Sequence, residues 1–190
     1  MEMKASASLP TRFGNFQAFA FSDNEKEHLA LVKGDVKGKE NVLVRVHSQC
    51  TTGDVFASLK CDCREQLEKA LRKIAKAENG ALVYLDQEGR GIGLANKIKA
   101  YDLQDKGQDT VEANISLGFP PDARNYKAAG KILRALGIKS VLLLTNNPEK
   151  RAGLGLNGIK ITKCIPLLTK PNKFNRAYLS AKKKKLGHIL

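Results

Sequence analysis

The stretch ALVYLDQEGRGIGLANKIKAYDLQDKG, residues 81–107, decides the predicted fold. Its first five residues form a short apolar run that is typical of a buried strand. The glycine-rich segment EGRGIG follows, and then a helical segment that Gly107 would end. A buried strand that passes through a short turn into a helix is the repeating unit of a sheet with parallel strands and covered faces.

The flanking segments extend this pattern. VLLLTNN (141–147) is a second buried strand, and Pro148 at the start of the next segment suits the first turn of a helix. Apolar residues recur at helical spacing over 67–74 and 129–136. Nearer the N-terminus, FGNFQAFAF, HLALVKGD and VLVRVHSQ predict strands in antiparallel arrangement. We therefore predict an α/β fold with an α+β tendency: a single compact domain over residues 1–190, with a mixed sheet flanked by helices and a β-rich N-terminal third.

Composition and charge limit the function classes. With 42% hydrophobic and 27% charged residues the chain is typical of a globular protein. No apolar run reaches the ~18 residues of a membrane span, and MEMKASASLP has no apolar signal core, so we expect a cytoplasmic protein with reduced thiols and no membrane partner. The net charge of +14 lies in the last third, where Glu149 is the sole acid among fifteen Lys and Arg. This asymmetry suggests an anionic partner, although we expect the KKKK run at 182–185 to be a solvated tail.

Three of the four cysteines lie close together in CTTGDVFASLKCDC (50–63). The sulfur atoms of two thiolates on one tetrahedral zinc ion lie about 3.7 Å apart, whereas residues i and i+2 of a strand lie about 7 Å apart. Cys61 and Cys63 must therefore occupy a turn, and the intervening residues are enough for a short helix that returns the chain to Cys50. Three clustered thiols in a reducing compartment indicate zinc, with three inert buried thiols as the alternative.

The nature of a zinc site depends on its fourth ligand. Structural sites have four protein ligands, whereas catalytic sites keep one position for water, whose pKa the ion lowers to about 7. Cys164 lies far along the chain in KITKCIPLL and is predicted to be a small buried hydrophobic residue. His47, three residues before Cys50, could close a Cys3His site. Both the open and the closed site are therefore compatible with the residues.

Two polar turns, EGRGIG and TNNPEK, follow two of the buried strands and precede helices. Backbone N–H groups at a helix start attract phosphate, and ligands gather at the carboxyl ends of parallel strands, so the two turns predict one pocket. EGRGIG is not a Rossmann fingerprint, because Leu94 stands where a third glycine is needed, and a tight turn is its alternative reading. Asp122 and Arg124 in PPDARN are either functional or a surface ion pair.

Together these motifs resemble GTP cyclohydrolase II, the enzyme that opens riboflavin biosynthesis. The resemblance runs from LPTRFGNF (9–16) to KKLGHIL (184–190), through RVHSQCTTGD, SLKCDC, QEGRGIGLANKIKAYDLQDKG, DTVEAN, DARNY and LLTNNPEK. It implies that Cys50, Cys61 and Cys63 bind one catalytic zinc ion per chain. It also implies that Asp122 is the proton acceptor, Arg124 the proposed nucleophile and Tyr101 an active-site tyrosine in ring opening. The implied GTP-binding residues are Arg45, Val46, His47, Ser48, Gln49, Gln66, Glu88, Gly89, Arg90, Thr110, Thr145 and Lys150.

The resemblance implies a hydrolase that acts on GTP at C8 of guanine and releases formate and pyrophosphate. The other product is 2,5-diamino-6-(5-phosphoribosylamino)pyrimidin-4(3H)-one, and a homodimer and Mg²⁺ on the polyphosphate are expected. Many family members have Glu at the position of Gln49, a difference that concerns a nucleotide contact and not the metal. A guanidinium is almost never neutral, so we expect Arg124 to stabilise charge at the α-phosphate. No 3,4-dihydroxy-2-butanone 4-phosphate synthase domain is expected in these 190 residues.

Three other functions remain as alternatives. A zinc-containing nucleic-acid binder would use the basic last third and a closed metal site, but only 6% of the residues are aromatic and Trp is absent, which disfavours a base-stacking surface. A zinc nucleobase deaminase would need H-x-E and P-C-x-x-C, whereas this chain has His47-Ser48-Gln49 and C-x-C. A close relative of the cyclohydrolase with an altered product is the third.

Overall fold

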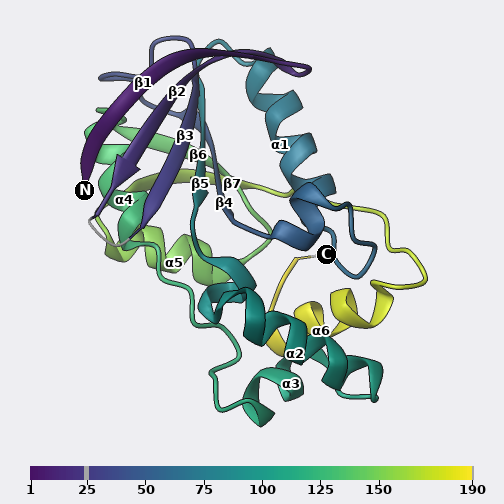
Figure 1. The fold of residues 1–190 in the computed structure, drawn as a ribbon. Coiled ribbons are helices and arrows are strands. Elements are labelled where there is room, and N and C mark those ends of the chain that lie inside the picture. The colour runs from purple at the N-terminus through teal and green to yellow at the C-terminus, as the bar shows by residue number, and fades with distance from the viewer. Residues whose placement is uncertain (24–25, 190) are drawn as a thin grey trace.

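The computed structural model describes residues 1–23 and 26–189; Leu190, the last residue of the KKLGHIL motif, lies outside them. One mixed sheet organises the protein, with the strand order β1-β2-β3-β5-β4-β6-β7 (Figure 1). The strands are β1 (Glu2–Thr11), β2 (Gly14–Ser22), β3 (Glu27–Lys33), β4 (Val42–Ser48), β5 (Gly80–Leu85), β6 (Ser140–Leu144) and β7 (Lys160–Ile165). The predicted α/β fold with a β-rich N-terminal third is confirmed.

The sheet has an antiparallel and a parallel half. Strands β1, β2 and β3 form an antiparallel meander, and β3 pairs with β5 in the same way. Strand β4 pairs in parallel with both β5 and β6, so its prediction as an antiparallel strand was wrong. The reason is the connection that follows it: a helical crossover returns the chain in the same direction, whereas only a short hairpin would reverse it.

Helices cover both faces of the sheet. The helices are α1 (Cys63–Lys76), α2 (Gly93–Asp105), α3 (Thr110–Ser116), α4 (Lys127–Ala135), α5 (Pro148–Leu156) and α6 (Arg176–Leu186). On one face, Ala70 and Ile74 of α1 pack against Leu82 of β5. On the other, Ile132 of α4 and Leu154 of α5 join the larger cluster of buried hydrophobic residues. Covering both faces explains why β5 and β6 are almost wholly apolar.

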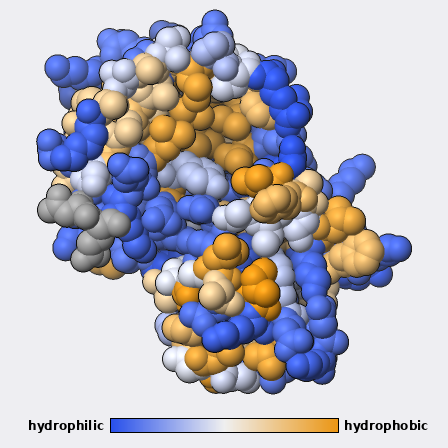
Figure 2. Space-filling view, viewed as in Figure 1, coloured by the Kyte–Doolittle hydropathy of each residue, from blue (hydrophilic) through white to orange (hydrophobic). Residues whose placement is uncertain are grey.

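Helices α2, α3 and α6 gather beyond the carboxyl ends of the parallel strands, in the lower part of Figure 1. The sequence patterns did not predict α3 or α6. Helix α3 begins with a capping box, in which Asp109 accepts the N–H of Glu112 and the Glu112 carboxylate accepts the N–H of Asp109. Figure 2 shows hydrophobic residues gathered over the sheet and hydrophilic ones between the sheet and these lower helices. Among the described residues, no helix has the length and hydropathy to cross a membrane.

Candidate active site

A cavity of about 120 Å³ lies where β4, β5 and β6 end. All the predicted site residues line it except Val46 and Asp122. Val46 is buried behind the cavity, where its carbonyl oxygen accepts a hydrogen bond from Lys150 Nζ at 2.6 Å. The two polar turns therefore meet in one pocket at the carboxyl edge of the sheet, as the sequence predicts.

Three thiols form a cluster on one side of this cavity. Cys50 follows β4, the turn of π-helix η1 (Thr51–Val55) brings the chain round, and Cys63 is the first residue of α1. The sulfur atoms of Cys50 and Cys61 lie 3.7 Å apart, and the ligand atoms of all three residues lie within 4.8 Å of one another. The predicted turn and short helix are confirmed. Among residues 1–23 and 26–189, this is the cluster that could hold a metal ion.

Neither residue considered as a fourth ligand belongs to the cluster. Nε2 of His47 lies 3.2 Å from both carboxylate oxygens of Asp54, to which it must donate because an ionised carboxylate only accepts. Burial lowers the pKa of His47, with the hydrogen bond to Asp54 opposing this effect. Cys164 lies on β7 and packs against the hydrophobic core. The arrangement thus favours a three-thiol site over a closed Cys3His site.

Lys97 of α2 is a neighbour of the thiols that sequence reasoning missed. Its Nζ lies 3.0 Å from the sulfur of Cys50 and 2.8 Å from Oε1 of Glu88. Hydrogen bonds with Cys61 and Cys63, together with the charge of Lys97, lower the pKa of Cys50, which favours the thiolate that a metal needs. Spacing was the available signal, because Lys97 precedes Tyr101 by one helical turn and shares its face.

Glu88 and Tyr101 occupy fixed positions beside this lysine. The carboxylate of Glu88 accepts the N–H groups of Thr51 at 2.6 Å and Gly89 at 2.7 Å, so protein groups already occupy it. The hydroxyl of Tyr101 lies 3.3 Å from Oγ1 of Thr52. Burial raises the pKa of Tyr101, so the phenol keeps its proton at neutral pH. Tyr101 is therefore a proton-bearing group beside the thiol cluster.

Three basic side chains in the cavity have no carboxylate partner among the described residues. Arg45 donates to the carbonyl oxygen of Leu144 at 2.9 Å and to Oε1 of Gln66 at 2.6 Å. Lys150 donates to a backbone carbonyl, and Arg90 donates to the carbonyl oxygen of Pro121 at 3.4 Å. Burial lowers the pKa of Arg45 to about 10, and burial with the nearby charges of Arg45 and Arg124 lowers that of Lys150 well below its ordinary value. Cations held by neutral acceptors remain available to an anion.

Arg90 also has an unusual backbone conformation. It lies in the short 3₁₀ turn η2 (Glu88–Gly91), and its φ of 60° is in the left-handed region that few residues other than glycine adopt. EGRGIG therefore forms the tight turn that was its alternative reading, and the same turn places Arg90 in the cavity wall. Strained backbone of this kind is frequent at ligand sites.

Asp122 and Arg124 form a largely buried ion pair, with side chains 18% and 13% exposed. Nε of Arg124 lies 2.8 Å and 3.1 Å from the two carboxylate oxygens, and a terminal nitrogen also contacts Asp122. Although burial of the guanidinium opposes its charge, the hydrogen bonds to Asp122 raise the pKa of Arg124. The alternative of a surface ion pair is wrong, and Arg124 is a permanent cation.

The other predicted residues lie in the walls. The side-chain amide of Gln49 donates to Oγ1 of Thr51 at 3.1 Å, and Oγ1 of Thr145 accepts the N–H of Asn147 at 3.0 Å. Thr110 is buried at the start of α3. Several buried polar atoms of cavity-lining residues have no hydrogen-bond partner: the donors Arg45 Nε, Arg90 Nη2 and Asn147 Nδ2, the hydroxyl oxygen of Ser48, and Nδ1 of His47 and of His188. Buried polar groups normally have partners, so the three donors indicate a ligand that carries acceptors.

The C-terminal segment supplies further residues that the sequence did not predict. Tyr178, Lys182 and His188 line the cavity. The prediction that residues 182–185 are a solvated tail was wrong for Lys182, which is 7% exposed. Burial, and then the charges of Lys182 and nearby basic residues, lower the pKa of His188 to about 3, so this imidazole is neutral. Helix α6 lies beside α2 and α3 (Figure 1), and the chain then returns to the segment after β6, where the carbonyl oxygen of Asn146 accepts the N–H of Ile189 at 3.0 Å.

Comparison with known proteins identifies the family. A family model described as GTP cyclohydrolase II matches residues 2–166. The chain belongs to the GTP cyclohydrolase II family. The matched part contains every predicted site residue and ends before α6.

Relatives with curated names agree with this assignment. A protein named GTP cyclohydrolase-2 from Picrophilus torridus is 50% identical over 100% of this chain and 99% of its own length. One named riboflavin biosynthesis protein RibBA from Endomicrobium trichonymphae is 56% identical over 97% of this chain, which spans 46% of that relative. Among solved structures, RibBX of A. baumannii, a two-domain 3,4-dihydroxy-2-butanone 4-phosphate synthase, has a TM-score of 0.45 at 22% identity. That match covers 86% of this chain and 40% of the other, and is too distant to support an argument.

Proposed function

We propose that residues 1–190 form one GTP cyclohydrolase II domain that hydrolyses GTP at C8 of guanine and releases formate and pyrophosphate, the first step of riboflavin biosynthesis. The observation that carries this proposal is that one cavity is lined by two chemically different sets of residues. Its lining includes the cluster of three thiols and three basic side chains without a carboxylate partner among the described residues, Arg45, Arg90 and Lys150. A ligand with a ring to be attacked and a polyphosphate to be neutralised matches both.

Zinc fits the thiol cluster. Soft thiolates select zinc, and the 3.7 Å separation of Cys50 and Cys61 equals the spacing expected of two ligands on one tetrahedral ion. When bound, zinc supplies a Lewis acid that lowers the pKa of a coordinated water toward neutrality. Lys97 donates to the sulfur of Cys50 and so offsets part of the negative charge of three thiolates. Tyr101 holds its proton at the phenol oxygen and can donate it to the ring nitrogen that is freed as guanine opens.

Basic side chains of the cavity would bind the phosphates of GTP. GTP carries about four negative charges, and Arg45, Arg90 and Lys150 can each form charge-assisted hydrogen bonds with them. Arg124 is held by Asp122 and keeps its charge, which supports a clamp on the α-phosphate over a covalent nucleophile. Mg²⁺ would bind mainly to the phosphates themselves. A homodimer and a cytoplasmic location remain predictions from the resemblance and the composition.

Product analysis tests this proposal. Purified protein with GTP and Mg²⁺ should release formate, pyrophosphate and the diaminopyrimidine product. Cys50→Ser should lose zinc and nearly all formate release, while slow release of pyrophosphate to give GMP continues, because the phosphate clamp is separate from the thiols. Formate release that persists at the wild-type rate in zinc-free protein would contradict the mechanism. The nucleic-acid alternative predicts instead binding with a steep dependence on salt and no turnover of GTP.

A further inference from the structure

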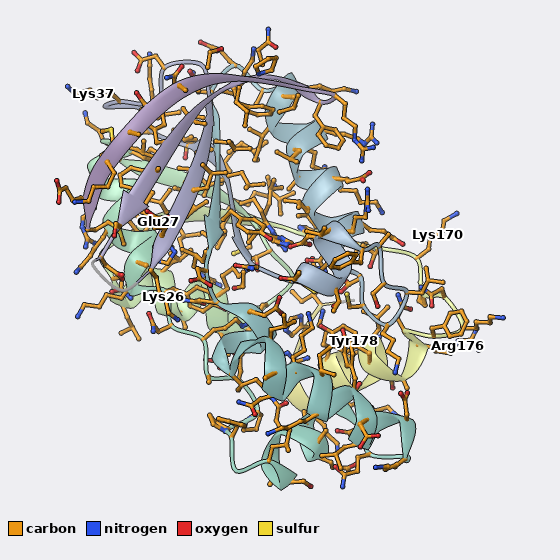
Figure 3. All side chains as sticks on the ribbon, viewed as in Figure 1. Lys26, Glu27, Lys37, Lys170, Arg176 and Tyr178 are labelled. Atoms are coloured by element: carbon orange, nitrogen blue, oxygen red, sulfur yellow. The ribbon has the colours of Figure 1, made fainter. Side chains whose placement is uncertain are left out.

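The C-terminal helix contributes one buried lysine to the cavity. Lys182 is 7% exposed, whereas its neighbours Lys183 and Lys184 are exposed. Its Nζ lies 2.9 Å from Oδ1 of Asp62 and 4.3 Å from the ring centre of Tyr178, a residue that Figure 3 labels. A buried ammonium is costly unless it is paired, so the ion pair with Asp62 holds Lys182 in this position.

Asp62 connects this lysine to a cation in the phosphate-binding wall. Its Oδ2 accepts hydrogen bonds from Nε2 of Gln66 at 2.5 Å and Oγ1 of Thr169 at 3.1 Å. Oε1 of Gln66 then accepts a hydrogen bond from Arg45 at 2.6 Å. The partners fix the orientation of the amide, because the carboxylate needs a donor and the guanidinium needs an acceptor. A continuous chain of contacts therefore runs from α6 to β4.

The charge of Asp62 determines how a change at Lys182 would affect Arg45. Asp62 is 1% exposed, and its negative charge attracts Arg45. Without a cation of its own, Asp62 would satisfy its buried charge by drawing in the guanidinium of Arg45. Arg45 would then be shared between a carboxylate of the protein and the phosphates of the ligand.

We propose that Lys182 is a positioning residue for nucleotide binding: it neutralises Asp62 and so keeps Arg45 available to the triphosphate. The proposal rests on the proposed function, because it assumes a polyphosphate ligand. It assigns a role to α6, which lies outside residues 2–166. The three exposed lysines that follow Lys182 have no part in it.

The test compares Lys182→Met with Lys183→Met, a change of the same kind on the same helix. The probe is inorganic pyrophosphate, whose binding is followed by calorimetry and does not depend on turnover. Lys182→Met should weaken pyrophosphate binding about tenfold and raise KM for GTP about tenfold, with kcat within about threefold. Lys183→Met should stay within about twofold of wild type, and Lys182→Arg, which keeps the charge, within about threefold. Equal affinity of Lys182→Met and Lys183→Met would overturn the proposal.

A double variant separates positioning from packing. Asp62→Asn combined with Lys182→Met removes both buried charges, so Arg45 has no competing carboxylate, and binding should return to within about threefold of wild type. If Lys182 only packed α6 against the site, the double variant would bind no better than Lys182→Met. Failure of both variants to fold would mean that the pair serves stability, and would also overturn the proposal. Absence of formate release by the wild type would contradict the proposed function alone, because the pyrophosphate comparison still decides the role of Lys182.

Discussion

Gly53 offers the sharpest test of the thiol cluster. It is buried in η1, between the first two cysteines of the cluster. A Cβ at this position would lie 2.7 Å from the sulfur of Cys61, 3.0 Å from that of Cys50 and 3.1 Å from Cβ of Cys63. The φ of Gly53 is not among the positive values, so the position needs glycine for space and not for its backbone conformation. The perturbation is Gly53→Ala.

The expected effect follows from these distances. Non-bonded heavy atoms are at their optimum about 3.5–4.0 Å apart, so the sulfur of Cys61 would have to move by about 1 Å. Metal–ligand distances in a working site hold to about ±0.2 Å. Cys50 and Cys61 are both buried, and Lys97 contacts Cys50, so the thiols have little room to move together. We therefore expect Gly53→Ala to weaken zinc binding at least about 100-fold, or roughly 2.7 kcal/mol.

Zinc content and affinity provide the assay. Zinc per chain is measured by mass spectrometry after dialysis, and affinity by competition with a chromophoric chelator. Gly155→Ala is the matched control, because Gly155 also lies in a helix without a positive φ and an added Cβ would meet nothing within 4 Å. It should keep its zinc and gain roughly 0.5–1 kcal/mol of stability. Wild-type zinc affinity in Gly53→Ala would refute the close-packing argument.

Three further predictions concern single side chains. Cys61→Ser should lose the zinc that Cys164→Ser keeps, because only Cys61 belongs to the cluster, and metal analysis of the two proteins checks this. Arg124→Ala should slow pyrophosphate release by ~10² or more. If Arg124 is a charge clamp, Arg124→Lys should recover part of that rate. A rate for Arg124→Lys equal to that of Arg124→Ala would contradict the clamp. Lys150 has a lowered pKa in the free protein, and bound phosphates will raise that pKa, so pyrophosphate should bind with uptake of a proton. For the same reason, the affinity for pyrophosphate should fall as the pH rises from the lowered pKa toward the ordinary value of 10.5. Calorimetry in buffers of different ionisation enthalpy measures this uptake, and Lys150→Met should abolish it.

The parallel half of the fold could be predicted because its signals are local. A buried apolar run, a polar turn and a helix occur in that order twice, around 81–107 and 141–156. The direction of β4 could not be predicted in the same way, because an alternating strand has the same pattern in either direction. Helix α6 has no apolar periodicity, and Lys182 on its buried side has Asp62 as its partner, a contact far along the chain that sequence patterns do not show.

In the candidate site, too, residues that are close in sequence could be predicted, and contacts between residues far apart in sequence could not. The thiol cluster could be predicted from spacing, since its members lie within one short segment of chain. The only signal for Lys97 was its helical spacing from Tyr101. Lys182 had no such signal, because its partner Asp62 contacts it only after folding, and a lysine with an unknown partner is normally taken to be solvated. Asp122 was predicted as a site residue, but it contacts Arg124 and is not itself among the residues that line the cavity.

The pairing of the basic residues in the cavity separates two kinds of role. Lys97 and Lys182 each have a carboxylate partner, and a buried ion pair of this kind fixes geometry without leaving net charge for a ligand. Among the described residues, Arg45, Arg90 and Lys150 have only neutral acceptors, so no carboxylate of the protein competes with a ligand for them. Removal of an unpaired cation should therefore weaken pyrophosphate binding and reduce its salt dependence, whereas removal of a paired cation should act through the carboxylate that it leaves behind. For this reason, when a paired cation has been removed, a second substitution that removes its carboxylate partner should restore pyrophosphate binding. When an unpaired cation has been removed, no substitution of a carboxylate should restore it.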